Sequence, residues 1–115
     1  MEITEKIIDQ VAVLTLKGSV VAEPTIHEIR DMIHALIGRE RKFVILNMEE
    51  VTYMNSMGLG MLVAALTTLR RIGGDLKLVC LTANVKNSFV ITQLTQVFQI
   101  FETEKEALAS FNQAG

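Results

Sequence analysis

The sequence predicts an α/β fold, a small mixed β-sheet that opens with an antiparallel hairpin and continues through strand–helix–strand crossovers. First, two strand-like segments at the start of the chain are separated by only two residues. Second, apolar runs typical of strands then alternate with segments of helical periodicity. Third, 115 residues that are 50% hydrophobic can bury one core but are too few for two domains. We therefore expect residues 1–115 to form a single domain with right-handed crossovers.

The first half of the chain predicts three strands and a helix. Residues 3–8 and 11–16 should form the hairpin, and Gly18 should end its second strand. Pro24 suits the first turn of a helix whose apolar positions recur at three and four as far as Gly38, which should end it. Residues 42–47 are apolar on both faces, which favours a central strand covered by its neighbours.

The second half predicts a second helix, which runs from Met57 to the left-handed stop supplied by Gly73-Gly74. A strand, an irregular helix and an edge strand should follow at residues 76–81, 85–94 and 100–101. Thr103 and Glu106 then fit a capping box, in which each side chain accepts a hydrogen bond from a backbone amide. A short final helix should follow and contain Leu108 and Phe111.

Composition and charge exclude several classes of function. The formal net charge is -2 and no run of Lys or Arg could neutralise the phosphates of a duplex, so direct nucleic-acid binding is not expected. Residues 43–46 and 61–66 are the longest apolar stretches and fall far short of the roughly 20 residues that cross a bilayer, so membrane insertion is not expected. The first ten residues lack the features of a signal peptide, which predicts a cytoplasmic protein. The lone Cys80 is expected to be a small buried residue at a strand end.

The segment between the third strand and the second helix, residues 48–60, is the candidate functional loop, because functional residues gather in the strand-to-helix loops of parallel sheets. Ser56 stands just before the helical periodicity begins, so its hydroxyl is expected to cap the helix. The same position suits a phosphate, since the first-turn amides and the helix dipole favour an anion. Gly58 and Gly60 lower helix propensity there, which indicates a backbone that is approached closely or that moves.

Residues 51–60 read Val-Thr-Tyr-Met-Asn-Ser-Met-Gly-Leu-Gly, which resembles the signature of the STAS-domain anti-sigma factor antagonists, a class of small bacterial switch proteins. The apolar strand before it, the paired glycine after it and the order of elements over the whole chain are similar as well. The resemblance implies a small mixed sheet with helices packed mainly on one side. It also implies that an anti-sigma factor with serine kinase activity phosphorylates Ser56. The unphosphorylated form would bind this partner and free a sigma factor for transcription, and the phosphorylated form would not.

The chain departs from the family's pattern at three positions. The residue before the serine is usually aspartate and is Asn55 here, which removes a charge but keeps a similar shape. The residue after the serine is commonly small and polar and is Met57 here, and Val21 stands where the family tends to have another aspartate. These departures concern recognition by the kinase. They leave open a non-phosphorylated adaptor or scaffold of the same fold, in a stress-signalling assembly or a lipid-transport system.

We expect the loop at residues 51–57 and the start of the second helix to form the partner surface, with Met54, Met57 and Leu59 leaving apolar area exposed; the alternative is that Met54 and Met57 pack inward. The residues predicted to bind the partner are Val21, Met54, Asn55, Ser56, Met57, Gly58 and Leu59. The protein itself is expected to be a monomer or a weak homodimer.

Catalytic, metal and cofactor sites are poorly supported by the sequence. Met54 stands where a nucleophile elbow needs glycine, and no histidine follows Ser56 to serve as its base. His27 and His34 lie seven residues apart on the first helix, about 10 Å along its axis, which is too far to share one metal ion without other ligands. The Gly58-Leu59-Gly60 segment lacks the third glycine of a dinucleotide fingerprint. We therefore expect no enzymatic activity, no bound metal and no cofactor.

Overall fold

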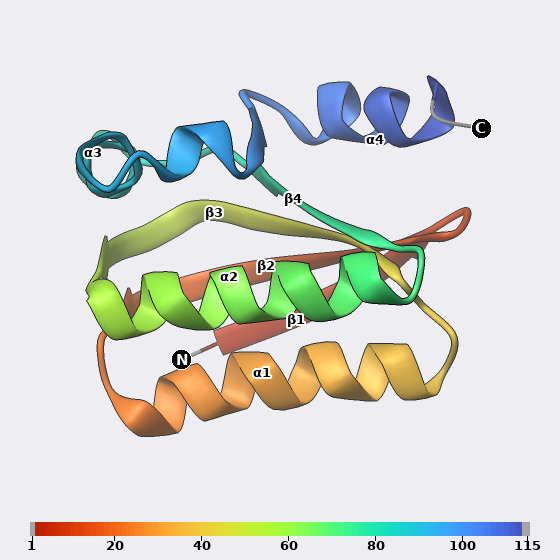
Figure 1. Cartoon of the computed structure of the whole chain (residues 1–115), viewed down its shortest axis with the longest axis horizontal. Helices are drawn as coiled ribbons and strands as arrows, with labels where there is room; N and C mark the ends of the chain where they lie inside the picture. Colours follow the sequence, from red (N-terminus) through yellow and green to blue (C-terminus); the bar gives the residue numbers. More distant parts are fainter. Residues whose placement is uncertain (1, 114–115) are drawn as a thin grey trace.

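The computed structural model describes residues 2–113, which form one five-stranded sheet with helices on both faces (Figure 1). The strands are β1 (Glu2–Ile8), β2 (Val11–Val20), β3 (Phe43–Met54), β4 (Asp75–Val79) and β5 (Gln99–Phe101). The helices are α1 (Glu23–Gly38), α2 (Ser56–Arg71), α3 (Ala83–Ile91) and α4 (Glu104–Gln113), with a short 3₁₀ helix η1 (Leu94–Gln96) after α3. The strand order follows the chain, β1 pairs antiparallel with β2, and the other pairs are parallel. The predicted hairpin followed by crossovers is confirmed.

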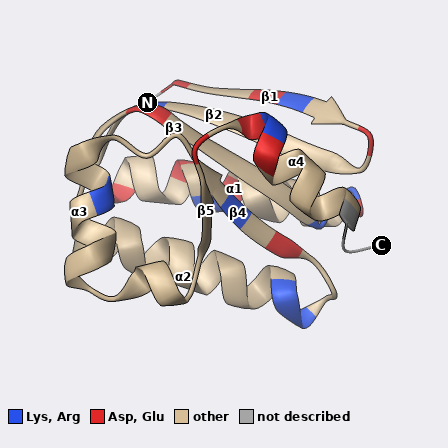
Figure 2. Cartoon of the chain, turned by 90° about the horizontal axis from the view of Figure 1, so that it is seen from above, with Lys and Arg blue, Asp and Glu red and all other residues tan. Residues whose placement is uncertain are grey.

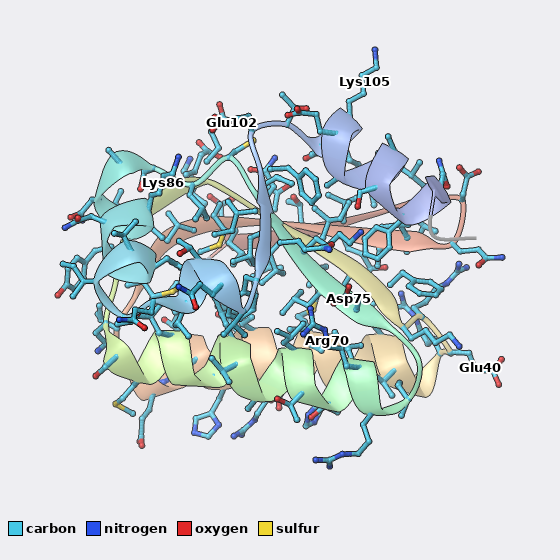
Figure 3. All side chains as sticks on the ribbon, turned by 45° about the horizontal axis from the view of Figure 1, so that its top comes forward. Glu40, Arg70, Asp75, Lys86, Glu102 and Lys105 are labelled. Atoms are coloured by element: carbon cyan, nitrogen blue, oxygen red, sulfur yellow. The ribbon has the colours of Figure 1, made fainter. Side chains whose placement is uncertain are left out.

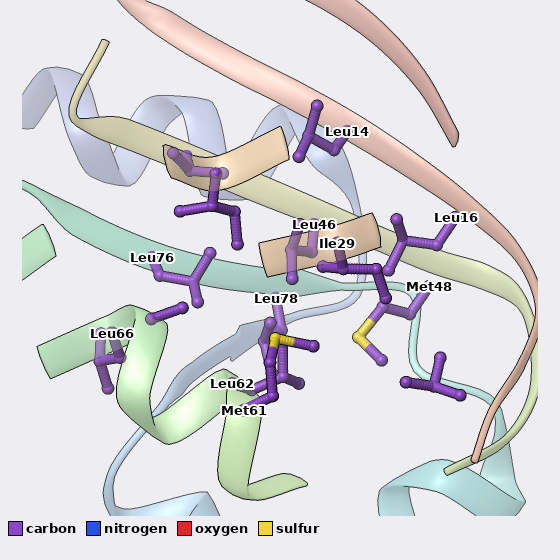
Figure 4. Close-up of a cluster of buried hydrophobic side chains, with 14 of the residues drawn as sticks. Leu14, Leu16, Ile29, Leu46, Met48, Met61, Leu62, Leu66, Leu76 and Leu78 are labelled. Carbon is purple, nitrogen blue, oxygen red and sulfur yellow. The ribbon is translucent and has the colours of Figure 1, made fainter. Parts of the chain in front are cut away.

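The sheet buries apolar side chains on both of its faces, because alternate residues of its central strands point to opposite sides. Leu14, Leu46 and Leu78 belong to the larger core, which α1 and α2 cover and to which α3 contributes Phe89 (Figure 4). The neighbouring residues Val13, Ile45 and Val79 belong to a smaller core that includes Ala107 of α4. Figure 1 shows α4 across the sheet from α1 and α2. The helices are therefore mainly on one side, as the resemblance implies.

Strands β2 and β3 are longer than the sequence predicts. β2 continues through Gly18, which has a φ of 125°, so the expectation that this glycine ends the strand is wrong. β3 continues to Met54, so most of the predicted loop is strand. The alternation of buried and exposed residues expected of a strand is interrupted in β3, because β3 has one more residue than β2 at each of two bulges. At the first bulge, Thr15 to Lys17 faces Asn47 to Glu50. At the second, Gly18-Ser19 faces Val51 to Tyr53. The buried residues of this stretch consequently recur at intervals of three, at Met48, Val51 and Met54.

The ends of the helices follow the predictions with local differences. α1 ends at Gly38, but the left-handed residue after it is Glu40, with a φ of 62°. After α2, Gly73 has a φ of 85°, and a Cβ on Gly74 would lie 2.1 Å from the Lys42 carbonyl oxygen, so both positions need glycine. The helix predicted at residues 85–94 instead starts at Ala83 and ends at Ile91.

The capping box at Thr103 and the position of Cys80 both differ in detail from the predictions. The Thr103 hydroxyl accepts from the Glu106 amide at 3.1 Å, as a capping box requires, but the Glu106 carboxylate accepts from that hydroxyl at 3.2 Å and not from a backbone amide. Cys80 is half-buried just after β4, where a φ of 59° ends the strand two residues earlier than predicted. Its thiol donates to the Glu102 carbonyl oxygen at 3.3 Å, and burial, reinforced by nearby Glu49, raises the pKa of the thiol.

Candidate functional site

Ser56 is the first residue of α2, at the carboxyl end of β3, where the strand passes into the helix through Asn55 alone. Its side chain is exposed, and its hydroxyl makes no hydrogen bond to any other residue in the described range. The expectation that Ser56 caps the helix is wrong. The cap is Asn55, whose backbone is extended and whose Oδ1 accepts from the Gly58 amide at 3.0 Å. The Ser56 hydroxyl is therefore free of a structural role in this turn.

Asn55 also joins the start of α2 to the end of β2. Its backbone amide donates to the Val20 carbonyl oxygen at 3.3 Å, and its Nδ2 donates to the Val21 carbonyl oxygen at 2.9 Å. An aspartate, the residue common in the resembled family, could keep the cap but would lack the donor for Val21. The asparagine thus holds the β2–α1 connection against the loop that bears Ser56.

Gly58 lies where the two strand ends approach α2 most closely. A Cβ at this position would lie 2.8 Å from the Val20 carbonyl oxygen and 3.0 Å from Cγ of Met54. At Gly60 a Cβ would meet nothing within 4 Å. The close approach of the backbone, one of the two reasons predicted from the sequence, therefore explains Gly58. It does not explain Gly60.

The structure divides the predicted partner-binding residues into exposed and buried groups. Met57, next to the exposed Ser56 in the chain, has an exposed fraction of 50%, and Val21, whose carbonyl oxygen accepts from Asn55, has one of 36%. Met54 is 2% exposed and Leu59 6%, so the expectation that these two leave apolar area at the surface is wrong. Met54 is buried because β3 extends to it and pairs it with Val20, and Leu59 faces the larger core from the first turn of α2.

Other exposed groups at this end of the sheet were not singled out from the sequence. Tyr53 has an exposed fraction of 49%. The hydroxyls of Ser19 and Thr52 lie 3.1 Å apart, which links the ends of β2 and β3, and Asn84 Nδ2 donates to the Thr52 carbonyl oxygen at 3.0 Å. A strand prediction extended through residues 48–54 would have found Tyr53, but the two bulges obscure the alternation on which such a prediction depends.

Met57 also lies at one end of a shallow cavity of about 220 Å³ between α1 and α2. The lining is mainly apolar, with Ile26, Ile33, Met61 and Ala65 below and Arg30 and His34 on the α1 side. The segment that bears Ser56 is uncharged, because residues 51–69 contain no Asp, Glu, Lys or Arg, as the tan ribbon from the end of β3 along α2 shows (Figure 2). A charge added at Ser56 would therefore dominate the local potential.

The two histidines considered as metal ligands do not form a metal site with other residues in the described part of the chain. His27 accepts a hydrogen bond from Arg30 one turn along α1, and His34 lines the shallow cavity. Across residues 2–113, no three His, Cys, Asp or Glu side chains are grouped so that they could hold a metal ion. None of the helices described is long and apolar enough to cross a membrane.

Comparison with known proteins supports the resemblance. The family model of the STAS domain matches residues 2–107. BtrV of Bordetella bronchiseptica, named as a candidate anti-sigma factor antagonist, is 25% identical over 114 residues, which are 99% of this chain and 97% of that protein.

Solved structures share the fold. A candidate anti-sigma factor antagonist from Thermotoga maritima superposes with a TM-score of 0.85 at 22% identity, over 94% of this chain and 92% of that chain. The anti-sigma factor antagonist SpoIIAA in its unphosphorylated form gives a TM-score of 0.83 at 21% identity, over 97% of each chain. The phosphorylated form of Bacillus SpoIIAA gives a TM-score of 0.74 at 20% identity, over 96% of this chain and 99% of that chain.

Proposed function

Since the chain belongs to the STAS domain family, we propose that it is an anti-sigma factor antagonist, a protein-binding switch that phosphorylation of Ser56 turns off. In its unphosphorylated form it binds an anti-sigma factor with serine kinase activity and thereby frees a sigma factor. The similarity to BtrV and to SpoIIAA supports this assignment of function, and the existence of SpoIIAA in a phosphorylated and an unphosphorylated form supports control by phosphorylation. The proposal places the protein in the cytoplasm, as a monomer or weak homodimer without catalytic activity of its own.

One observation supports the switch above all others: the Ser56 hydroxyl is exposed and unbonded, at the first position of a helix whose cap is a different residue. A kinase can therefore transfer the γ-phosphoryl group of ATP to Ser56 Oγ, with release of ADP, without breaking a hydrogen bond that the fold needs. The new dianion would stand at the positive end of the helix dipole, and no acidic residue occupies the first turn of α2. We expect the fold to tolerate the phosphate.

The binding surface would not tolerate it. The exposed large side chains of the predicted surface are the apolar side chains of Val21 and Met57 and the phenol of Tyr53. No cation in residues 51–69 could compensate a phosphate that becomes buried between the two proteins. A loss of only about 3 kcal/mol of binding free energy would lower the affinity more than a hundredfold.

Titration calorimetry with the anti-sigma partner tests the switch. Ser56→Ala should bind like the unphosphorylated protein, and Ser56→Asp should bind roughly a hundredfold more weakly while its melting temperature stays close to that of the wild type. Thr67→Asp is the matched control, because it adds the same charge to an exposed position of the same helix about 16 Å from Ser56. It should bind normally. Equal affinities for Ser56→Ala and Ser56→Asp would refute the switch.

A phosphoryl-transfer assay separates the switch from the adaptor alternative. The wild-type chain, incubated with the cognate kinase and ATP, should acquire phosphate that Ser56→Ala does not acquire. If no transfer occurs, the protein is a non-phosphorylated adaptor of the same fold. Asn55→Asp then tells whether the asparagine before the serine is the cause, since it restores the charge that the family usually has there.

A further inference from the structure

A cavity of about 630 Å³ lies at the opposite end of the parallel strands from Ser56. Three chain turns enclose it: the β1–β2 turn with Asp9 and Gln10, the α2–β4 turn with Gly73 and Gly74, and the last turn of α4 with Phe111 and Asn112. All three lie at the right-hand end of the molecule in Figure 1. The 16 residues of α2 separate this end from Ser56 by about 24 Å. A ligand here would not touch the proposed partner surface.

The group that makes this cavity unusual is Lys77, in the middle of β4. Lys77 is 4% exposed and points to the α4 side of the sheet, where an apolar residue is the norm. Its Nζ donates to Ser110 Oγ at 2.5 Å and lies 4.0 Å from the centroid of the Phe111 ring. No Asp or Glu within residues 2–113 forms an ion pair with it. Burial lowers the pKa of Lys77, against the smaller opposing effect of the Asp75 charge.

The acidic residues that line the cavity form no ion pair with Lys77, although the Asp75 charge offsets part of the effect of its burial. The Asp75 carboxylate is already engaged, because it accepts from Arg70 Nε at 3.1 Å and from the Leu76 amide at 2.9 Å (Figure 3). Asp9 is exposed on the hairpin turn. A buried ammonium without a direct ion-pair partner is costly in a protein interior, even where a carboxylate such as that of Asp75 lies nearby. The Ser110 hydroxyl and the Phe101 and Phe111 rings compensate this cost only in part, so a ligand carboxylate would complete the surroundings of Lys77.

The lining also limits which anion fits. The amides of Gly73 and Gly74 donate to the carbonyls of Arg70 and Leu69, so they offer nothing to a phosphate. The two aspartates at the wall would repel a dianion about twice as strongly as a monoanion. The rings of Phe43 and Phe111, 5.5 Å apart and edge to face, provide an apolar surface for the rest of a ligand. A single carboxylate with an apolar body meets these conditions, and the volume suits a small organic molecule.

We propose that this cavity binds a small organic monocarboxylate, whose carboxylate accepts hydrogen bonds from Lys77 Nζ and whose apolar body packs against the outer surface of the Phe43–Phe111 ring pair. The site is independent of the switch at Ser56. It gives the domain a place for a metabolite-like ligand at the end of the sheet that the partner does not cover.

The test uses phenylacetate as the probe and amide chemical shifts of the full chain as the readout. Wild-type protein should show saturable shifts around the β1–β2 turn, the α2–β4 turn and the end of α4 at phenylacetate concentrations up to about 10 mM. Lys77→Met, which keeps the length of the side chain without its charge, should weaken binding about tenfold or more. Lys86→Met removes an exposed lysine on α3 and should bind as the wild type does. The neutral analogue 2-phenylethanol should bind about tenfold more weakly than phenylacetate.

Several results would overturn the proposal: no saturable shifts in the wild type, equal affinity of Lys77→Met, or equal affinity for 2-phenylethanol. A second measurement needs no ligand. If Lys77 serves a ligand and not the fold, Lys77→Met should melt at the same temperature as the wild type or higher. A clearly lower melting temperature would show that the lysine stabilises the fold through Ser110 and the aromatic rings, and the proposal would fail.

Discussion

At the scale of single residues, the turn that bears Ser56 depends on Asn55 more than on the serine. The asparagine uses both ends of its amide, one as the helix cap and the other as a donor to the Val21 carbonyl. Serine and asparagine are both common caps, but the amide of asparagine has separate acceptor and donor atoms, so it can hold the Gly58 amide and the Val21 carbonyl at the same time. The division of roles leaves the Ser56 hydroxyl available for modification.

Gly58 and Gly60 give a matched pair of substitutions on one helix. Gly58→Ala should destabilise the protein by about 1–3 kcal/mol, because its methyl group would press on the Val20 carbonyl and move the end of β2. Gly60→Ala should stabilise it by about 0.5–1 kcal/mol, because it has open space and alanine has the higher helix propensity. Urea unfolding of the two variants checks the signs. If both changes destabilised the protein equally, close approach of the strand ends would not be the reason for Gly58.

At the scale of elements, α4 is fastened to the sheet by a polar contact at its first turn. Glu104 Oε2 accepts from Asn47 Nδ2 at 2.6 Å, and Glu104 Oε1 lies 2.9 Å from Lys6 Nζ. Asn47 is buried on β3, and its Oδ1 accepts from the Glu49 amide at 3.0 Å next to the first bulge. The hydrogen bond from Asn47, helped by Lys6, holds the pKa of Glu104 below its ordinary value. Strands β1 and β3 are thus linked to α4 through one carboxylate.

This carboxylate makes the attachment of α4 sensitive to acid. Because the folded pKa of Glu104 is lowered, its stabilising effect is present above the unfolded value of about 4.3 and is lost as the pH falls through the folded value. Glu104→Gln should therefore cost about 1–2 kcal/mol at pH 7, and its deficit relative to the wild type should shrink toward pH 3. Glu102→Gln, at an exposed carboxylate, is the control and should change stability little at any pH. A deficit of Glu104→Gln that stayed constant between pH 7 and pH 3 would contradict this account.

At the scale of the whole molecule, one sheet joins two separate cores. Neighbouring residues of β3 serve each of them, since Leu46 faces α1 and α2 and Ile45 faces α4, both fully buried. Because β3 belongs to both cores, unfolding of one core should also disrupt the other. We expect the domain to unfold as one cooperative unit.

Substitutions on the two faces of β3 test this cooperativity. Leu46→Ala and Ile45→Ala should each destabilise the protein by about 2–5 kcal/mol and shift the urea midpoint without changing the slope of the transition. Glu50→Ala, an exposed position on the same strand, should stay within about 0.5 kcal/mol of the wild type. Two separate transitions for Ile45→Ala, with α4 melting first, would show that the smaller core is an independent unit.

The sequence by itself determined the order and type of the elements, because their signals are local. The periodicity of α1 and α2, the two-residue hairpin turn and the stop at Gly73-Gly74 depend on neighbours within a few residues. The position of Ser56 at a strand-to-helix junction followed from the same local signals, and so did the family that the motif resembles.

The tertiary structure alone decided which residues of the site reach the surface. The bulges that extend β3 arise from pairing with β2, more than 30 residues earlier in the chain, and they bury Met54 while they expose Tyr53. The hydrogen bond from Asn55 to Val21, the tight fit of Gly58 and the burial of Lys77 beneath α4 likewise depend on partners far away in the sequence. A local pattern fixes the period of a segment, but only packing between distant segments fixes its register, and the register determines which side chains solvent can reach.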